Sequence, residues 1–225
     1  MTERHFDTEL KCMKDGLMAM AIQVEEMIDL AIVVITKQSD AQAEQVVELD
    51  RIVDAQEVRL DCACIDLLGL RAPFATDLRF LAGCLKIIPQ LERIGDHCKN
   101  IGRRGLILNR QAQVLNPDYF EKMGQAVCGM VCDSVEAFLK GDVDLANRVI
   151  KADDLVDELH HQIFGELLRQ MIKDPLCIER ASHLIIVNKD FERIADHATN
   201  ICEEVLYILE GVNVKHPYLH QDPHD

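Results

Sequence analysis

Apolar and polar residues alternate along most of the chain with the three-and-four spacing of amphipathic helices. No segment shows the convincing two-residue alternation of a strand. Breaks in the pattern fall at Ser39-Asp40, Gly69 to Pro73, Asn109 to Pro117, Gly141-Asp142 and Lys173 to Pro175. We therefore predict an all-α chain with six helices over residues 5–38, 40–69, 74–108, 117–140, 142–172 and 176–210.

The third and sixth predicted helices contain nearly the same ten residues. Residues 92–101 read ERIGDHCKNI and residues 192–201 read ERIADHATNI. The second and fifth helices also correspond, because VVELD at 46–50 matches VIKAD at 149–153. A repeat of about 100 residues is too long for a solenoid. We predict instead two tandem three-helix bundles, related by internal duplication and by a pseudo-two-fold axis.

This duplication predicts one domain over residues 1–110 and a second over residues 116–212. The remaining residues, 213–225, contain three His and two Pro and are predicted to form a flexible tail. Pro89 falls inside the third helix, where a missing amide hydrogen predicts a kink.

Each copy of the shared motif places two carboxylates four residues apart, and therefore on one helix face. They are Glu92 and Asp96 in the first copy and Glu192 and Asp196 in the second. Like charges at this spacing repel, so we expect compensation by a bound cation, or by Arg93 and neighbouring basic groups. A solvated acidic face is the usual meaning of one such pair, but its presence in both halves favours a function.

The second helix carries a stripe of carboxylates that could face the pair on the third helix. Asp50, Asp54, Glu57 and Asp61 follow a spacing of four, three and four residues, which is one continuous face. Hard cations and iron bind carboxylate oxygens. An ordinary hydrophilic face would explain this stripe equally well, so both interpretations stay open for the stripe taken alone.

The fifth helix repeats only part of this stripe. Asp153 and Asp157 correspond to its first two members, but His160 and Phe164 replace the last two. We therefore expect a second site with a different ligand set. His97 is expected near the same side of the third helix as the carboxylates. The predicted metal ligands are Glu92, Asp96, Asp50, Asp54, Glu57 and Asp61 in the first half, and Glu192, Asp196, Asp153 and Asp157 in the second.

Charge and composition restrict the partners and the compartment. The formal net charge is −15, which argues against binding to nucleic acid or to an anionic bilayer. Nine Cys residues without CxxC spacing do not form a disulfide or zinc-knuckle pattern, so we expect buried thiols in a reducing compartment. The N-terminal residues lack a signal-peptide profile and the apolar runs are short. These observations predict a cytoplasmic protein that does not enter the membrane.

Sequence signatures of catalysis are missing or incomplete. Glu158 and His161 match half of a di-iron signature, but no second ExxH stands in a matching helix. We find no glycine-rich phosphate loop and no GxSxG elbow. We therefore expect a protein that is not an enzyme. A metal-dependent enzyme that uses the carboxylate clusters, and a metal-buffering protein, remain the alternatives.

Two copies of LERIGDHCKNI and FERIADHATNI, each closing a three-helix repeat, resemble the PhoU family of phosphate-transport regulators. Residues 75–79, ATDLR, and the carboxylate stripe before them fit the same resemblance, which extends from about residue 8 to 212. The resemblance implies two similar three-helix bundles side by side. It also implies metal clusters at the two ExxxD motifs, with iron, zinc, manganese or nickel as the candidate ions.

The resemblance further implies a function. Such a protein acts with the ATPase subunit of a phosphate ABC transporter and with the sensor histidine kinase of the phosphate two-component system. It keeps phosphate uptake and the phosphate regulon low when phosphate is plentiful. A homodimer is left open. Because His160 and Phe164 interrupt the second stripe, the family pattern of ligands is incomplete there.

Overall fold

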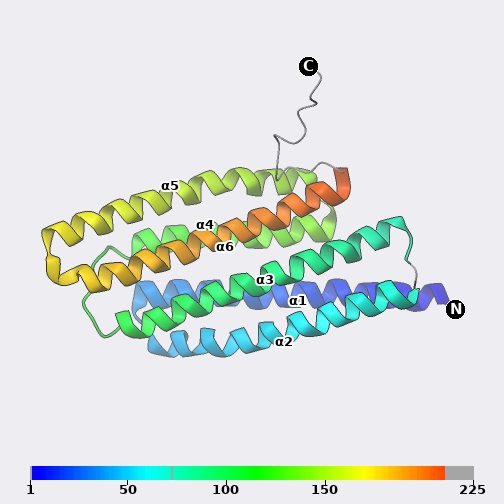
Figure 1. Cartoon of the computed structure of the whole chain (residues 1–225), viewed down its shortest axis with the longest axis horizontal. Coiled ribbons are helices and arrows are strands. Elements are labelled where there is room, and N and C mark those ends of the chain that lie inside the picture. Colours follow the sequence, from blue (N-terminus) through cyan, green and yellow to red (C-terminus); the bar gives the residue numbers. More distant parts are fainter. Residues whose placement is uncertain (1, 72, 211–225) are drawn as a thin grey trace, which may run out of the picture.

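The structure is a computed structural model that describes residues 2–71 and 73–210. Within these residues it contains six α-helices, one short 3₁₀ helix and no strand, which confirms the all-α prediction (Figure 1). The predicted flexible tail lies outside the described residues. The elements are α1 (Thr2–Lys37), α2 (Asp40–Arg71), α3 (Ala75–Leu108), α4 (Asp118–Lys140), α5 (Val143–Lys173), η1 (Pro175–Cys177) and α6 (Ile178–Glu210).

The break residues end the helices where the pattern predicts. Gly141 has a φ of 67° after α4, and Gln38 has a φ of 52° at the equivalent turn after α1. Asp142 then caps α5, because its carboxylate accepts a hydrogen bond of 2.9 Å from the amide of Leu145. α3 continues through Pro89. The kink expected there stays a prediction.

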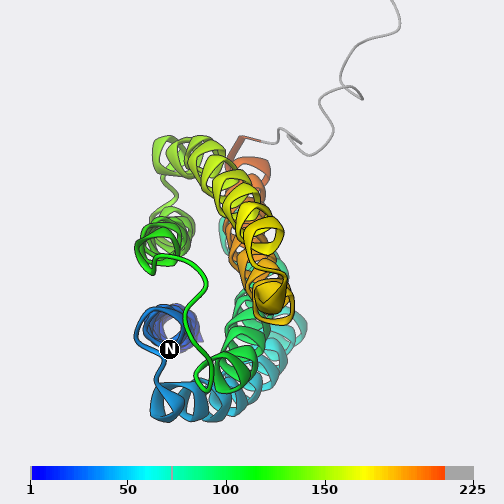
Figure 2. The same ribbon diagram turned by 90° about the vertical axis from the view of Figure 1, so that its left-hand side faces the viewer.

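The six helices form two three-helix bundles that lie side by side. Helices α1, α2 and α3 contact one another, as do α4, α5 and α6. The bundles meet where α1 contacts α4 and where α3 contacts α6, so each helix at this contact faces its own equivalent. α2 and α5 lie at opposite outer edges (Figures 1 and 2). This arrangement confirms the duplication and the pseudo-two-fold axis.

One hydrophobic core extends through both bundles and across their contact. Its residues repeat with the duplication, since α1 and α4 bury identical side chains 103 positions apart. These pairs are Met20 with Met123, Val24 with Val127, and Met27 with Met130. Between α3 and α4 the inter-repeat linker, residues 109–117, connects the two bundles. Among the described residues, no helix has both the length and the apolar character needed to span a bilayer.

Candidate functional site

The carboxylate stripe of α2 and the carboxylate pair of α3 face each other, as the sequence predicts. Burial, with the negative charges of Asp96 and Glu57, raises the pKa of Glu92 to about 7. Burial also raises the pKa of Asp50, against the opposing effect of a nearby ammonium group. Asp54 acts on both Asp50 and Glu92. These five residues therefore form one group, which we call the first carboxylate cluster.

The ammonium group belongs to Lys99, which sequence reasoning missed. Its Nζ lies 2.7 Å from Asp50 Oδ2 and 2.5 Å from Asp96 Oδ1, so one cation connects α2 with α3. Arg93 lies 3.6 Å from both Glu92 and Asp96. Burial alone would raise the pKa of Asp96, but Lys99 and Arg93 outweigh burial and lower it. The basic groups of α3 therefore relieve the like-charge repulsion at Asp96, while the pKa of Glu92 stays raised.

The remaining predicted ligand of α2 lies at the edge of this cluster. Asp61 stands one turn beyond Glu57 and raises the pKa of Glu57, whose own burial is the larger cause. Its position makes it the outermost carboxylate of the stripe. It contributes negative charge to the cluster through Glu57 rather than through the α3 pair.

The second carboxylate cluster lies between α5 and α6 and consists of Asp153, Asp157, Glu192 and Asp196. Burial, together with the charges of Asp157 and Asp196, raises the pKa of Asp153 to about 6. Burial and Glu192 likewise raise the pKa of Asp196. All four predicted ligands of the second half are therefore brought together.

The two clusters differ in their basic groups as well as at His160 and Phe164. Thr199 stands where the first repeat has Lys99, and its hydroxyl donates to the carbonyl of Ala195 at 2.8 Å instead of joining two helices. Lys189 pairs with this cluster at its margin, where its Nζ is 2.5 Å from Glu192. The second cluster therefore lacks an ammonium group at the position that Lys99 takes in the first.

The donor chemistry of both clusters fits a hard cation, because every predicted ligand offers a carboxylate oxygen. Burial first, and neighbouring carboxylates second, raise the pKa values of Glu92 and Asp153, and a cation would relieve this crowding of negative charge. As the side chains stand, no three His, Cys, Asp or Glu groups of the described residues are arranged to hold a metal ion. Binding would therefore need side-chain movement, for which the exposed Asp54 and Asp157 have room.

The expectation for His97 was wrong. Its ring does not share the face of the carboxylates but lies against α6, with Nδ1 3.0 Å from Oδ1 of Asp190. His197 of α6 lies against α3 in the same way. A helix turns by about 100° per residue, so the residue after Asp96 points toward a different neighbour. The motif therefore serves two surfaces: carboxylates toward α2 or α5, and imidazoles toward the other repeat.

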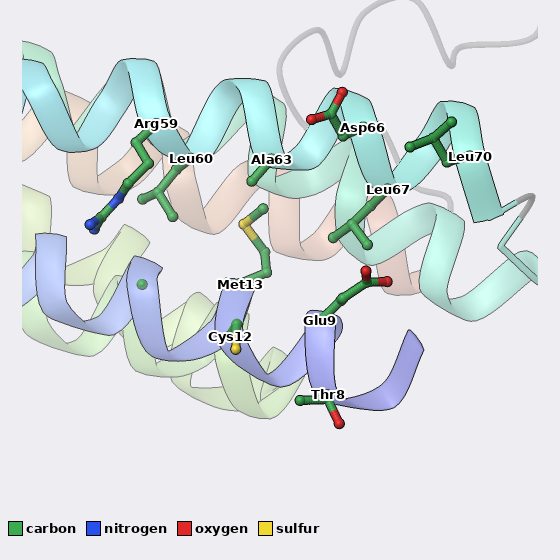
Figure 3. Close-up of a pocket in the computed structure, with 11 residues that line it drawn as sticks. Thr8, Glu9, Cys12, Met13, Arg59, Leu60, Ala63, Asp66, Leu67 and Leu70 are labelled. Atoms are coloured by element: carbon green, nitrogen blue, oxygen red, sulfur yellow. The ribbon is translucent and has the colours of Figure 1, made fainter. Parts of the chain in front are cut away.

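A groove of about 670 Å³ lies elsewhere, between the start of α1 and the end of α2 (Figure 3). Its apolar floor includes Met13 and Leu67, and Glu9, Arg59 and Asp66 supply charged groups. None of the predicted metal ligands lines this groove. The carboxylate clusters thus lie on helix faces and not in this hollow.

The PhoU domain family matches the chain twice, over residues 17–105 and 120–205. The chain belongs to the PhoU domain family. The two matches coincide with the two helical repeats, so the family unit is one three-helix bundle. Each match also contains one copy of the ExxxD motif and the helix that faces it.

Relatives share nearly the full length of the chain. A phosphate-specific transport system accessory protein PhoU homolog of Aquifex aeolicus is 40% identical, over 94% of this chain and 96% of that protein. The crystal structure of PhoU from Pseudomonas aeruginosa is similar with a TM-score of 0.88 and 33% identity, over 92% of this chain and 100% of that one. A phosphate transport system regulatory protein PhoU from Streptococcus pneumoniae has a TM-score of 0.84 at 26% identity, over 93% and 99%.

Proposed function

We propose that this protein is a negative regulator of phosphate uptake and of phosphate-regulon signalling. It acts as an adaptor between the ATPase subunit of a phosphate ABC transporter and a sensor histidine kinase. The observation that carries the proposal is the duplicated site, with one carboxylate cluster on α2 and α3 and an equivalent cluster on α5 and α6. The link to phosphate comes from the relatives, which are named as accessory and regulatory proteins of phosphate transport.

Two equivalent faces at opposite edges suit an adaptor that binds two partners. The faces are similar in shape because the fold is duplicated. They differ in charge, because only the first contains Lys99 and the carboxylates of Glu57 and Asp61. Electrostatic complementarity determines which partner binds more than it determines affinity. This difference lets each face select its own partner. The adaptor works at the cytoplasmic side of the membrane, where the ATPase subunit and the kinase domain are both accessible.

The position of the carboxylates favours a role in docking rather than in catalysis. Catalysis by a metal site needs an open coordination position inside a shaped pocket that excludes water. Asp54 and Asp157 are instead exposed to solvent. Solvent-facing carboxylates favour docking over hydrolysis or redox chemistry, and two small clusters offer little capacity for storing metal.

A metal ion has a place in this proposal as a structural cation. Asp153, Asp157, Glu192 and Asp196 would hold iron, zinc, manganese or nickel in the second repeat. When bound, the ion supplies positive charge that neutralises the crowded carboxylates. In the first repeat Lys99 already supplies part of that charge, so its cluster needs metal less. Metal binding would then make the two faces more alike.

The test is a double variant that removes one motif aspartate from each face, Asp96→Ala with Asp196→Ala. Asp196 is exposed and Asp96 is half-buried, and neither belongs to the hydrophobic core, so circular dichroism should show an unchanged helical content. In a reporter strain on phosphate-rich medium, we expect phosphate-starvation genes to be expressed. The matched control is Asp66→Ala with Asp144→Ala, which removes two exposed carboxylates outside the clusters and should leave repression intact. Full repression in the folded motif variant would refute the proposed docking faces.

A further inference from the structure

The inter-repeat linker fills a cleft at one end of the molecule. Leu115 is 9% exposed and joins the hydrophobic core. Gln38 Nε2 donates to the carbonyl of Gln111 at 2.9 Å, and Arg180 Nη1 donates to the carbonyl of Ala112 at 3.1 Å. Only about 30 Å³ of empty space remains beside the linker. This cleft, which we call the linker seat, therefore binds a segment that belongs to neither helix bundle.

Because the fold is duplicated, residues equivalent to those that line the linker seat also lie together where α6 ends. Equivalent residues are 103 positions apart in α1 and α4 and 100 positions apart in α3 and α6. Three wall residues of the linker seat, and the first residue of the linker, have equivalents that all line a second cavity, of about 420 Å³. We call this cavity the C-terminal cleft. The equivalent pairs are Ile35 with Phe138, Gln38 with Gly141, Leu108 with Ile208, and Asn109 with Leu209.

The C-terminal cleft lies at the opposite end of the molecule from the linker seat, because α3 and α6 end at opposite ends (Figure 1). No linker enters it, since the linker follows α3. The part of the chain that corresponds to the linker is the segment that follows α6. Leu209 lines the cleft itself, so this segment starts at the rim.

The sequence after α6 repeats the linker pattern at the same 100-residue offset. Residues 114–117 read VLNP and residues 214–217 read VKHP. Valine and proline are therefore kept at equivalent positions. Lys215 replaces the buried Leu115, but its aliphatic stem can cover an apolar wall while the ammonium group reaches a carboxylate. Asp77, which lines the C-terminal cleft, offers such a carboxylate.

From this correspondence, we propose that residues 211–219 bind in the C-terminal cleft of their own chain, as the inter-repeat linker binds in its seat. The donor that would hold the segment is already in position. Arg79 Nη1 of α3 is 3.4 Å from the carbonyl of Ile208, and the equivalent carbonyl of Leu108 accepts from Gln38 Nε2 at 3.3 Å. Gln38 uses that position to hold the linker as well, and the guanidinium of Arg79 has further N–H groups for the next carbonyls.

A tethered segment has an advantage over any separate peptide, because it starts at the rim of the cleft. Short tethers give effective concentrations in the millimolar range, so even weak contacts suffice for binding. Leu10 and Phe80 supply apolar surface to the cleft that the bound segment would cover. The segment would then join the ends of α1, α4 and α6 across both repeats, as the linker joins them at the other end.

The chain contains no Trp, so one introduced Trp is a unique fluorescent probe. We would compare Val214→Trp, inside the proposed segment, with Gln221→Trp, just beyond it. Binding in the cleft predicts a blue-shifted emission and several-fold weaker acrylamide quenching for the first variant. Adding Leu209→Glu, which puts a charge on the cleft wall, should make the two probes alike. Hydrogen exchange of the unmodified chain gives a second measurement. The backbone amides of residues 212–216 and 218–219 should exchange more slowly than in Leu209→Glu alone.

Three results would overturn the proposal. Equal emission and quenching of the two probes, with unprotected amides in the unmodified chain, would show that the segment does not bind. Protection that survives Leu209→Glu would place the segment outside this cleft. Protection that increases with protein concentration would assign the cleft to the segment of a second copy. Protection that is independent of concentration and is lost with Leu209→Glu supports the proposal.

Discussion

The imidazole rings of His97 and His197 lie next to each other between α3 and α6, with their centroids 5.6 Å apart and their planes tilted by 33°. His97 Nδ1 is 3.0 Å from Asp190 Oδ1, and His197 Nδ1 is 2.7 Å from Gln90 Oε1. Positions 90 and 190 are equivalent in the repeats, so each helix presents its imidazole to the same position of the other. The pseudo-two-fold axis therefore passes between the two rings.

This contact predicts a pH dependence of stability. Burial, together with the charge of His97, lowers the pKa of His197 to about 4 from an ordinary value of 6.5. Between these pH values His197 is protonated in the unfolded chain but not in the folded chain. The free energy of unfolding should therefore fall as the pH falls from 6.5 to 4. We expect His197 to account for about 1–3 kcal/mol of this loss.

Urea unfolding across this pH range, with His197→Gln beside the unmodified chain, measures the effect. The variant keeps an amide that can bond with Gln90, and its stability should fall less steeply between pH 6.5 and 4. His161→Gln, on the exposed face of α5, is the control and should keep the original slope. An unchanged slope in His197→Gln would contradict the prediction.

Glu92 should show the opposite dependence. Because burial and neighbouring carboxylates raise its pKa to about 7 from 4.5, its charge destabilises the fold above pH 7. The cost disappears as the pH falls, since below 4.5 the folded and the unfolded chain both carry the proton. Glu92→Gln should therefore raise the free energy of unfolding by about 1–3 kcal/mol at alkaline pH. It should have little effect below pH 4.5.

The matched variant for this measurement is Glu192→Gln, at the equivalent position of α6. Glu192 forms an ion pair with Lys189 at 2.5 Å, which the amide would weaken, so we expect no gain in stability from this change. Thermal or urea unfolding of both variants above pH 7 measures the two changes in the free energy of unfolding. A gain of the same size in both would mean that general negative charge, and not the crowding around Glu92, is responsible.

Most of the fold could be predicted from the sequence because the information is local. Apolar spacing and the break residues place the helix ends: α5, for example, is Val143–Lys173 against a prediction of 142–172. The duplication follows from residue identities alone. The way the two repeats pack together does not follow from the sequence, because it depends on which apolar stripe of α1 and α3 meets the equivalent stripe of α4 and α6.

The candidate site was predicted in its carboxylates but not in their partners. The stripe of Asp50 and Asp54 and the pair on α3 share known helix faces, so their convergence follows from periodicity. The role of Lys99 depends on the distance between α2 and α3, which no spacing within one helix reveals. The difference between Lys99 and Thr199 is visible in the aligned repeats, and it is the signal that would have pointed to unequal clusters.

The close contact of the bundles predicts a strong effect at Gly124. A Cβ at this position of α4 would lie 2.3 Å from Cγ1 of Ile32 on α1. Gly124→Ala should therefore destabilise the protein by about 1–3 kcal/mol, because the facing side chain must leave its position. Gly129→Ala on the same helix is the control, since nothing lies within 4 Å of its Cβ. It should stabilise the helix by about 0.5–1 kcal/mol. Equal effects in urea unfolding would contradict the packing of α1 on α4.

The exchange of Lys99 and Thr199 tests whether the two clusters differ in their need for metal. Lys99→Thr leaves Asp50, which is 4% exposed, without its cationic partner. We expect a loss of about 3–5 kcal/mol in chelated protein, which is the usual cost of breaking a buried ion pair. Added manganese or zinc should restore part of this loss. Thr199→Lys places an ammonium group beside Asp153 and should raise the melting temperature in the absence of metal.

The decisive quantity is the rise in melting temperature that metal causes, because a ligand that binds only the folded chain stabilises it by mass action. In the unmodified protein we expect this rise to come mainly from the second cluster. Thr199→Lys should abolish most of it, while Lys99→Thr should increase it. Asp66→Ala, outside both clusters, should leave the rise unchanged. A lysine at position 199 would compete with an ion bound in the second cluster. If metal stabilises the Thr199→Lys variant as strongly as the unmodified chain, the second cluster therefore does not bind the ion.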